Sequence, residues 1–368
     1  MATSILSDEK LKKQFEEDLR TAAAAVKRPN ILLLGNTGVG KSSLINTIFG
    51  RKLAEVSHLK PQTRGFHVYS TPEVPVNIID SEGYELENEA RFKTTLDEYI
   101  AENFANLEKQ IHICWYCISI SSGRVLPFDI ENIKHLQSKK IPTAVVFTQC
   151  DNDDPEGSTA KSLSDVIYRN FGNSIPCFQT SNDPEVNKEL DIDKLIEWSA
   201  NNISDENLRL GFVAAQKISL KEKDDAASTR VNWYTAGAAG VGASPIPCSD
   251  AVLLTGLQVK MAADIYNIYG LDNAISTVLR NVIQGKVVSM LGKMIVGNIL
   301  KWIPGLGTAA GAAINAAVAG AITFAMGKAL AALCHQAVID SWEGKDNMLG
   351  DLFTEENLDT LFSQYYKK

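Results

Sequence analysis

The stretch of sequence that decides the fold is Gly35-Asn36-Thr37-Gly38-Val39-Gly40-Lys41-Ser42. It matches the pattern G-x-x-x-x-G-K-[ST], follows an apolar run directly and leads into a helix-like segment, residues 43–49. Glycines let backbone N–H groups converge on an anion, and a helix N-terminus adds the positive end of its dipole. The order of strand, glycine-rich loop and helix therefore predicts a phosphate-binding loop, in which Lys41 reaches the outer phosphates and the Ser42 hydroxyl binds Mg²⁺.

Apolar and helix-like segments alternate around this loop, from residue 28 to about residue 203. The predicted strands are 31–34, 76–79, 113–120, 143–148 and 175–179, with 67–70 as a weaker candidate. The predicted helices are 43–49, 89–107, 128–137, 158–170 and 192–202. Alternation of this kind predicts an α/β domain, in which helices cover both faces of a mostly parallel sheet.

Nucleotide sites in such sheets lie at the carboxyl ends of the strands, so the residues at those ends are informative. Asp80 follows the predicted strand of residues 76–79, and Gly83 comes three residues later. A carboxylate there can hold Mg²⁺ through water, and a glycine N–H can bind a γ-phosphate. The polar, turn-rich connection of residues 59–65 offers Thr63 as a second ligand of the metal.

Two further motifs at strand ends predict the base that is bound. The segment Thr148-Gln149-Cys150-Asp151 follows one strand, and Thr180-Ser181-Asn182 follows the next. Asp151 can accept hydrogen bonds from N1–H and N2–H₂ of guanine, and adenine offers no such edge. A backbone N–H of the second turn can bind O6 of guanine. The order of all these motifs along the chain is that of a guanine-nucleotide site.

With these motifs, residues 28–202 resemble the translation-factor-like GTPases, in particular the Era-like group. The resemblance implies GTP and GDP as ligands and Mg²⁺ as cofactor. It implies that Lys41, Thr63 and Gly83 act at the reacting phosphate and that Ser42, Thr63 and Asp80 hold the metal. The nucleotide contacts that it implies come from the loop residues Gly35 to Ser42, from Ser43, and from Thr148, Gln149, Asp151, Thr180, Ser181 and Asn182.

Three residues depart from the pattern of that family. Gln149 stands where the family carries a lysine whose stem packs over the base, which predicts lower guanine affinity. Tyr84 stands where Ras-like enzymes carry a water-positioning glutamine. This predicts slow intrinsic hydrolysis, or a water-orienting group from a second subunit in a homodimer formed through the GTPase domain. Gly38 stands where potassium-dependent members carry asparagine, which argues against a potassium-supported mechanism.

Composition limits the class of protein. A chain of 368 residues suggests two domains, and its net charge of −8 argues against a general nucleic-acid binder. Its 6 cysteines show no metal-ligand clustering, which fits a reducing compartment. Cys114 and Cys117 are spaced like a redox pair, but they would face opposite sides of a buried strand. The charged segment of residues 8–13 argues against a secretory signal and favours a cytoplasmic protein.

The predicted domains are an N-terminal amphipathic helix (1–27), the GTPase domain (28–203), a connecting helix (204–228), a helical domain (229–340) and a C-terminal amphipathic helix (341–368). Phe15 and Leu19 lie on one stripe of the first helix, which we expect to pack on the domain that follows; a membrane or partner helix is the alternative. Thr354 is a candidate N-cap of the last helix, which we expect to dock on the protein's own bundle.

The helical domain is rich in Ala, Gly and Val, and residues 302–327 carry no charge. Small or short residues recur every four positions from Gly307 to Thr323, and such spacing lets helices approach closely. Three alternatives remain open: a soluble bundle, a bundle that inserts a hairpin of residues 286–335 into a membrane surface, and a permanent transmembrane anchor. Residues 233–271 resemble an uncharacterised helical domain found attached to bacterial Era-like GTPases and in YcjF-like inner-membrane proteins, which implies a link to membranes.

Two hypotheses follow from the sequence. The first is a guanine-nucleotide switch that hydrolyses GTP slowly and couples the nucleotide state to the helical domain. The second is a membrane-associated scaffold in which nucleotide has only a structural role.

Overall fold

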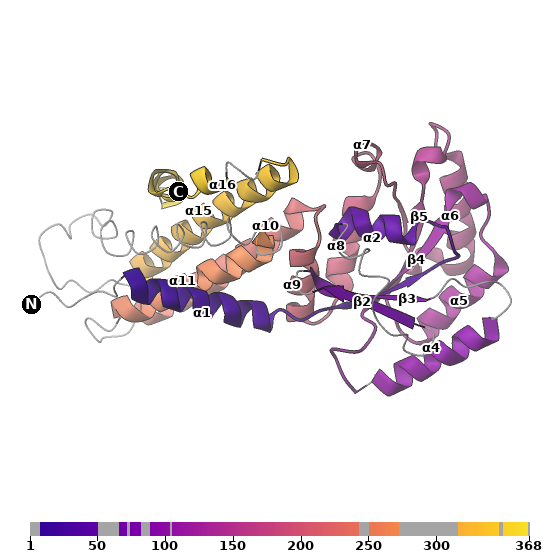
Figure 1. Ribbon diagram of the computed structural model, residues 1–368, viewed down its shortest axis with the longest axis horizontal. Coiled ribbons are helices and arrows are strands. Elements are labelled where there is room, and N and C mark those ends of the chain that lie inside the picture. Colours follow the sequence, from indigo (N-terminus) through magenta and orange to yellow (C-terminus); the bar gives the residue numbers. More distant parts are fainter. Residues whose placement is uncertain are drawn as a thin grey trace, which may run out of the picture. The chain divides into compact units, whose positions relative to one another are not determined.

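The computed structural model describes residues 8–50, 66–71, 74–81, 89–103, 105–242, 250–271, 316–345 and 349–366 (Figure 1). The chain forms two compact units. Val26–Glu222 make up the first unit, and Met1–Ala25 together with Lys223–Lys368 make up the second. We call them the nucleotide unit and the helical unit.

The nucleotide unit is built on a six-stranded sheet with the order β2-β3-β1-β4-β5-β6. Its strands are β1 (Asn30–Leu34), β2 (Phe66–Thr71), β3 (Val74–Ser81), β4 (Ile113–Ser119), β5 (Thr143–Thr148) and β6 (Cys177–Gln179). All neighbouring pairs are parallel except β2 and β3. The predicted mostly parallel sheet is therefore confirmed, and the weaker strand candidate is its antiparallel edge.

Helices cover both faces of this sheet. On one face, alternate side chains of the central strands share a core with α4 (Glu89–Asn103), α5 (Pro127–Ser138) and α6 (Ser158–Phe171). On the other face, Trp115 stacks on Phe49 of α2 (Lys41–Phe49) at a centroid distance of 6.0 Å. Its indole N–H also donates to Ser199 of α8 (Ile192–Asn202) at 3.0 Å. Strands that are buried on both sides read as continuous apolar runs, which explains the sequence of β4.

Cys114 and Cys117 are both buried free thiols in β4. Cys114 belongs to the core shared with α5, whereas Cys117 is three residues along and points to the opposite face. The prediction that the two side chains face opposite sides of a buried strand is confirmed.

Helix α4 ends at Asn103, before the predicted end at residue 107. A turn replaces the last predicted turn of helix, because the Asn106 side chain accepts a hydrogen bond from the Glu108 N–H at 3.0 Å. Asparagine favours such turns since its side chain competes with the backbone for hydrogen bonds.

Two helices occupy the stretch predicted as one connecting helix: α9 (Glu206–Ala215) and the start of α10 (Leu220–Gly242). The break lies at Gln216, whose side chain is fully buried. Its carbonyl oxygen accepts from the N–H groups of Ile218 and Ser219, and its amide donates to the Ser219 carbonyl, each at 2.8 Å. One glutamine thus binds three backbone groups of the connection between the two helices.

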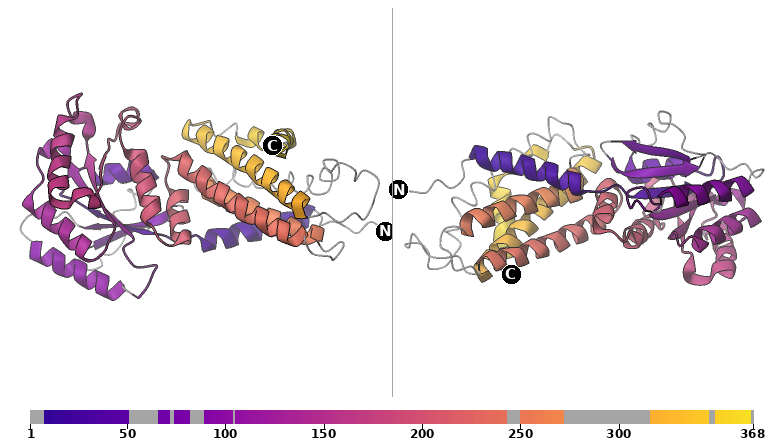
Figure 2. Two further views of the ribbon diagram at one scale, coloured as in Figure 1. Left: turned by 180° about the vertical axis from the view of Figure 1, so that it is seen from behind. Right: turned by 90° about the horizontal axis from the view of Figure 1, so that it is seen from below.

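The helical unit contains α1 (Asp8–Ala25), most of α10, α11 (Asp250–Tyr269), α15 (Ala316–Trp342), α16 (Leu349–Leu352) and α17 (Glu355–Tyr366), seen from two further sides in Figure 2. Helix α1 packs on α11 and buries Phe15 and Leu19 there. The expectation that this helix packs on the domain that follows it is wrong: its apolar stripe is matched by a helix more than two hundred residues later in the chain. Helix α17 packs on α15, with Thr354 as its N-cap, as predicted.

Helix α15 is a core helix of this unit. Gly327 lies so close to its neighbours that an added Cβ would be 2.7 Å from Val231 of α10 and 2.9 Å from Met261 of α11. Thr323 is fully buried and accepts a hydrogen bond from Gln258 at 3.2 Å. Among the described helices, α15 is the one long and apolar enough to cross a membrane by composition, and 67 % of its most apolar window is buried in the fold.

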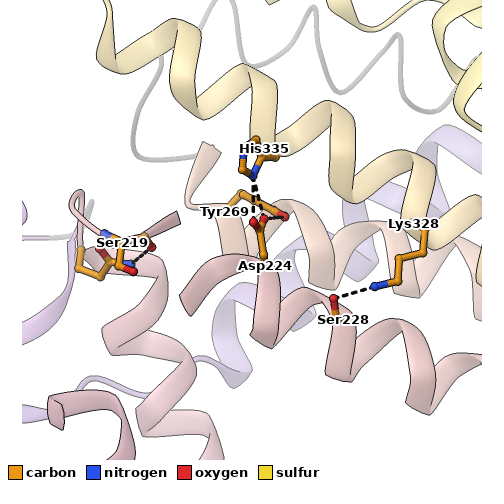
Figure 3. A network of polar contacts seen from close by, with 7 residues as sticks. Ser219, Asp224, Ser228, Tyr269, Lys328 and His335 are labelled. Carbon is orange, nitrogen blue, oxygen red and sulfur yellow. Dashed lines mark hydrogen bonds and ion pairs between the residues drawn. The ribbon is translucent and has the colours of Figure 1, made fainter. Parts of the chain in front are cut away.

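Polar contacts also tie α15 to the other helices of the unit (Figure 3). The Asp224 carboxylate of α10 accepts a hydrogen bond from the Tyr269 hydroxyl at 2.6 Å and lies 2.9 Å from Nδ1 of His335. Burial raises the pKa of Tyr269, and its hydroxyl therefore stays protonated as the donor. One turn further along α10, Ser228 accepts from Lys328 at 2.8 Å. These contacts fix the register of α15 against α10.

Candidate nucleotide-binding site

The candidate site lies at the carboxyl end of β1, which stands between β3 and β4 in the sheet. The chain adds β3 on one side of β1 and then crosses to add β4, β5 and β6 on the other. In open α/β sheets the crevice at such a reversal is where ligands bind. The phosphate loop, residues 35–42, starts at this point and runs into α2.

The first glycine of the loop is required by its surroundings. Gly35 has a φ of 136°, and a Cβ added to it would lie 2.3 Å from the backbone oxygen of Cys117 on β4. Gly40 has a φ of 92° and precedes the first residue of α2. Only glycine adopts these conformations readily, so both positions of the motif are explained by the backbone.

The Lys41 ammonium lies over the loop. It donates hydrogen bonds to the carbonyl oxygens of Gly35 at 2.8 Å and Asn36 at 3.2 Å. Thr37, Ser42 and Ser43 are exposed, whereas Val39 is buried and anchors the loop. The cation and the exposed hydroxyls thus gather at the N-terminus of α2, where an anion is favoured.

Asp80 is near the carboxyl end of β3, paired in register with Leu33 of β1. Burial raises the pKa of the Cys117 thiol to about 12; the charge of Lys41 lowers this pKa, and the charge of Asp80 raises it. Both charged groups therefore lie near one thiol beneath the loop. A carboxylate and the Ser42 hydroxyl are oxygen donors of the kind that Mg²⁺ prefers, so these two residues fit a magnesium site.

The two predicted base motifs meet beside the phosphate loop. A cavity is lined there by Gly40, Ser43, Leu44, Thr148, Gln149, Thr180, Ser181 and Asn182. Thr148 ends β5, and its hydroxyl donates to the carbonyl of Val39 in the phosphate loop. The structure thus brings together segments that are more than a hundred residues apart in the sequence.

Asp151 is exposed, and its carboxylate is oriented by Ser181, whose hydroxyl donates to it at 2.6 Å. Ser181 is buried and held by Asn187, whose side-chain oxygen accepts from the Ser181 N–H at 2.7 Å and whose amide donates to the Ser181 carbonyl. Asn187 was not predicted, since nothing in the sequence distinguishes it from an ordinary helix-end asparagine.

Several predicted residues lie outside the described part of the chain. They are Thr63, Gly83 and Tyr84, and most of the proposed membrane hairpin of residues 286–335. Their assignments remain predictions.

The fold and this arrangement of motifs define a P-loop GTPase. The family described as "50S ribosome-binding GTPase" matches residues 30–149, and a "domain of unknown function (DUF697)" matches residues 211–356. The chain belongs to the first family and carries the second as an additional helical domain, which is the YcjF-like family. The resemblance seen in the sequence is confirmed.

Individual proteins and a solved structure are similar to part of this chain. A probable GTP-binding protein EngB of Caldanaerobacter subterraneus is 32 % identical over 146 residues, which are 39 % of this chain and 73 % of that protein. Septin-8-A of Danio rerio is 27 % identical over 188 residues, 44 % of this chain and 43 % of the septin. The chain thus spans less than half of the septin. A crystal structure of a probable GTP-binding protein engB matches 47 % of this chain and 98 % of its own, at 18 % identity and a TM-score of 0.33.

Proposed function

We propose that this protein is a guanine-nucleotide switch. It binds GTP with Mg²⁺, hydrolyses it slowly to GDP, and passes the nucleotide state to its helical unit, which docks, dimerises or engages a membrane. The observation that carries the proposal is the cavity in which the phosphate loop meets both base motifs. We expect a cavity of this kind to accept a ligand that has phosphates at one end and a base at the other.

The chain's own residues support each part of the reaction, in which water attacks the γ-phosphate and GDP leaves. Lys41 and the loop N–H groups stabilise the negative charge of the phosphates. Asp151, held by Ser181, accepts from the guanine edge. Ser42, Asp80 and the predicted ligand Thr63 would hold Mg²⁺. When bound, that ion neutralises charge on the phosphate oxygens. Tyr84 lacks the amide of a water-positioning glutamine, which supports the slow rate.

Two variants test the site by isothermal titration calorimetry with GDP and GTP. Lys41→Ala should abolish measurable binding, and unchanged affinity would overturn the phosphate assignment. Asp151→Asn should shift preference from guanosine to xanthosine nucleotides, because an amide donates where the carboxylate accepted. Guanine selectivity that stays the same would remove Asp151 from the base site.

The second candidate, a membrane-associated scaffold with little hydrolysis, is favoured by the length and apolar composition of α15. Single-turnover hydrolysis by the full chain, with and without lipid vesicles, separates it from the switch. A switch shows hydrolysis and flotation with vesicles that depends on whether a GTP analogue or GDP is bound. A scaffold floats equally with both. Sedimentation of the full chain with each nucleotide tests the predicted homodimer.

A further inference from the structure

Two consecutive residues, the last residue of β5 and the one after it, bind two consecutive carbonyls of the phosphate loop. The Thr148 hydroxyl donates to the Val39 carbonyl, and the Gln149 side-chain amide donates to the Gly38 carbonyl at 3.4 Å. The base segment is therefore tied to the phosphate loop by side chains. The second bond is long, so the position of the Gln149 amide depends on what else holds it.

Ser119 holds the side-chain amide of Gln149 in place. It is buried at the carboxyl end of β4, paired in register with Thr148 of β5. Its hydroxyl donates to the side-chain oxygen of Gln149 at 2.5 Å, a short hydrogen bond. The same hydroxyl oxygen accepts from the Ser121 N–H at 3.2 Å, as the N-cap of a short 3₁₀ turn, η3 (Ile120–Ser122).

The direction of these bonds determines how the Gln149 amide is oriented. A hydroxyl has one proton to donate, and here that proton goes to Gln149. The amide oxygen therefore faces Ser119, and the amide NH₂ is left to face the carbonyl of Gly38. A flipped amide would lose the short hydrogen bond that Ser119 donates and would set its oxygen against the Gly38 carbonyl oxygen, which is a repulsive contact.

We propose that Ser119 is a positioning residue of the nucleotide site, which acts through Gln149 to couple the base segment to the phosphate loop. A neutral glutamine needs an external donor to orient its two-ended amide, unlike the lysine of the family pattern, which carries only donors. Gln149 also has a φ of 61°, a conformation that costs a non-glycine residue energy and persists only where surrounding contacts hold it. This inference rests on the proposed nucleotide site.

The test is a double-mutant cycle on the full chain, with the affinity for mant-GDP measured by fluorescence. Ser119→Ala should weaken binding by about three- to tenfold, the change expected for one lost hydrogen bond. In the Gln149→Ala background, the same substitution should change affinity by less than about twofold, because its target is gone. The loss of the N-cap of η3 is common to both backgrounds and cancels in the cycle.

Two matched variants sharpen the result. Ser122→Ala changes a neighbouring serine of the same turn, whose hydroxyl donates to the Ser119 carbonyl and does not contact Gln149; its affinity should stay that of the natural chain. Gln149→Glu keeps an acceptor for Ser119 but loses the donor to Gly38, and it should weaken binding at least as much as Ser119→Ala.

The outcomes separate this inference from the proposed function. If the natural chain binds no GDP, the proposed function fails. If it binds GDP and Ser119→Ala weakens binding equally in both backgrounds, or not at all, the positioning role is overturned. Undiminished binding by Gln149→Glu would equally overturn it, since the contact to the phosphate loop would then not matter.

Discussion

The close approach of Gly35 to the backbone of β4 allows a quantitative prediction for Gly35→Ala. The added Cβ would lie 2.3 Å from the Cys117 carbonyl oxygen, about 1 Å inside normal contact, and 3.1 Å from the Val39 side chain. The φ of 136° is also unfavourable for alanine. Strain of about 1–3 kcal/mol and overpacking of about 1–3 kcal/mol together predict a loss of roughly 2–6 kcal/mol in local stability.

Gly38→Ala is the matched control. Gly38 also has a positive φ, 80°, but a Cβ there would meet nothing within 4 Å. Its cost should be the backbone strain alone, about 1–2 kcal/mol. The difference between the two variants therefore isolates the clash with β4.

Hydrogen exchange of the full chain, followed by mass spectrometry, measures this effect where it arises. Peptides that cover β1 and β4 should exchange faster in Gly35→Ala than in Gly38→Ala, because separating the two strands opens their shared hydrogen bonds. Peptides from the helical unit should be unchanged in both. Equal protection of β1 and β4 in the two variants would refute the steric argument.

Two further predictions concern packing and charge. Partial burial works to raise the pKa of Asp97, but hydrogen bonds from Lys139 and His135 outweigh it and hold that pKa below its ordinary value. A carboxyl group with a lowered pKa stabilises the fold above about pH 4, and this stabilisation is lost as the pH falls further. Asp97→Asn should therefore lower the free energy of unfolding by up to about 1 kcal/mol at pH 7 and by progressively less below pH 4, as measured by thermal unfolding. A difference between the natural chain and the variant that stays constant with pH would contradict this. In the helical unit, Gly327→Ala should lower the unfolding free energy by about 1–3 kcal/mol, because its Cβ would lie 2.7 Å from a valine of α10. A Cβ added at Gly240 in α10 would have no neighbour within 4 Å, so Gly240→Ala should instead stabilise the helical unit by up to about 1 kcal/mol. Shifts of the same sign in the melting temperatures of the two variants would refute the packing argument for α15.

Much of the nucleotide unit could be predicted from the sequence because its signals are local. Each strand is a short apolar run, and each motif follows its strand within a few residues. Thr148, Gln149 and Thr180 were therefore placed correctly at strand ends, and the structure brings them to one cavity. The exceptions are residues such as Asn187 and Ser119, which bind a site residue without any pattern of their own.

In the helical unit, by contrast, the sequence indicates helices but not which helices pack together. Helix α1 was predicted as an amphipathic helix, yet it was assigned to the wrong neighbour, because it packs on α11 at residues 250–269. An amphipathic stripe shows that a helix has an apolar face but does not show which surface covers it. Likewise the composition of α15 suits a membrane as well as a core, and only its contacts with Val231 and Met261 show that it is packed in this fold.

The phosphate loop shows which features follow from the sequence and which depend on the tertiary structure. The sequence by itself predicts that residues 35–42 bind phosphate, because the motif and its flanking strand and helix are all local. The tertiary structure alone decided that Val39 is held by Thr148 at the end of β5 and Gly38 by the next residue, Gln149, and that Ser119 of β4 orients the Gln149 side chain. The physical reason is that strand pairing, which joins distant segments in register, determines which side chains meet.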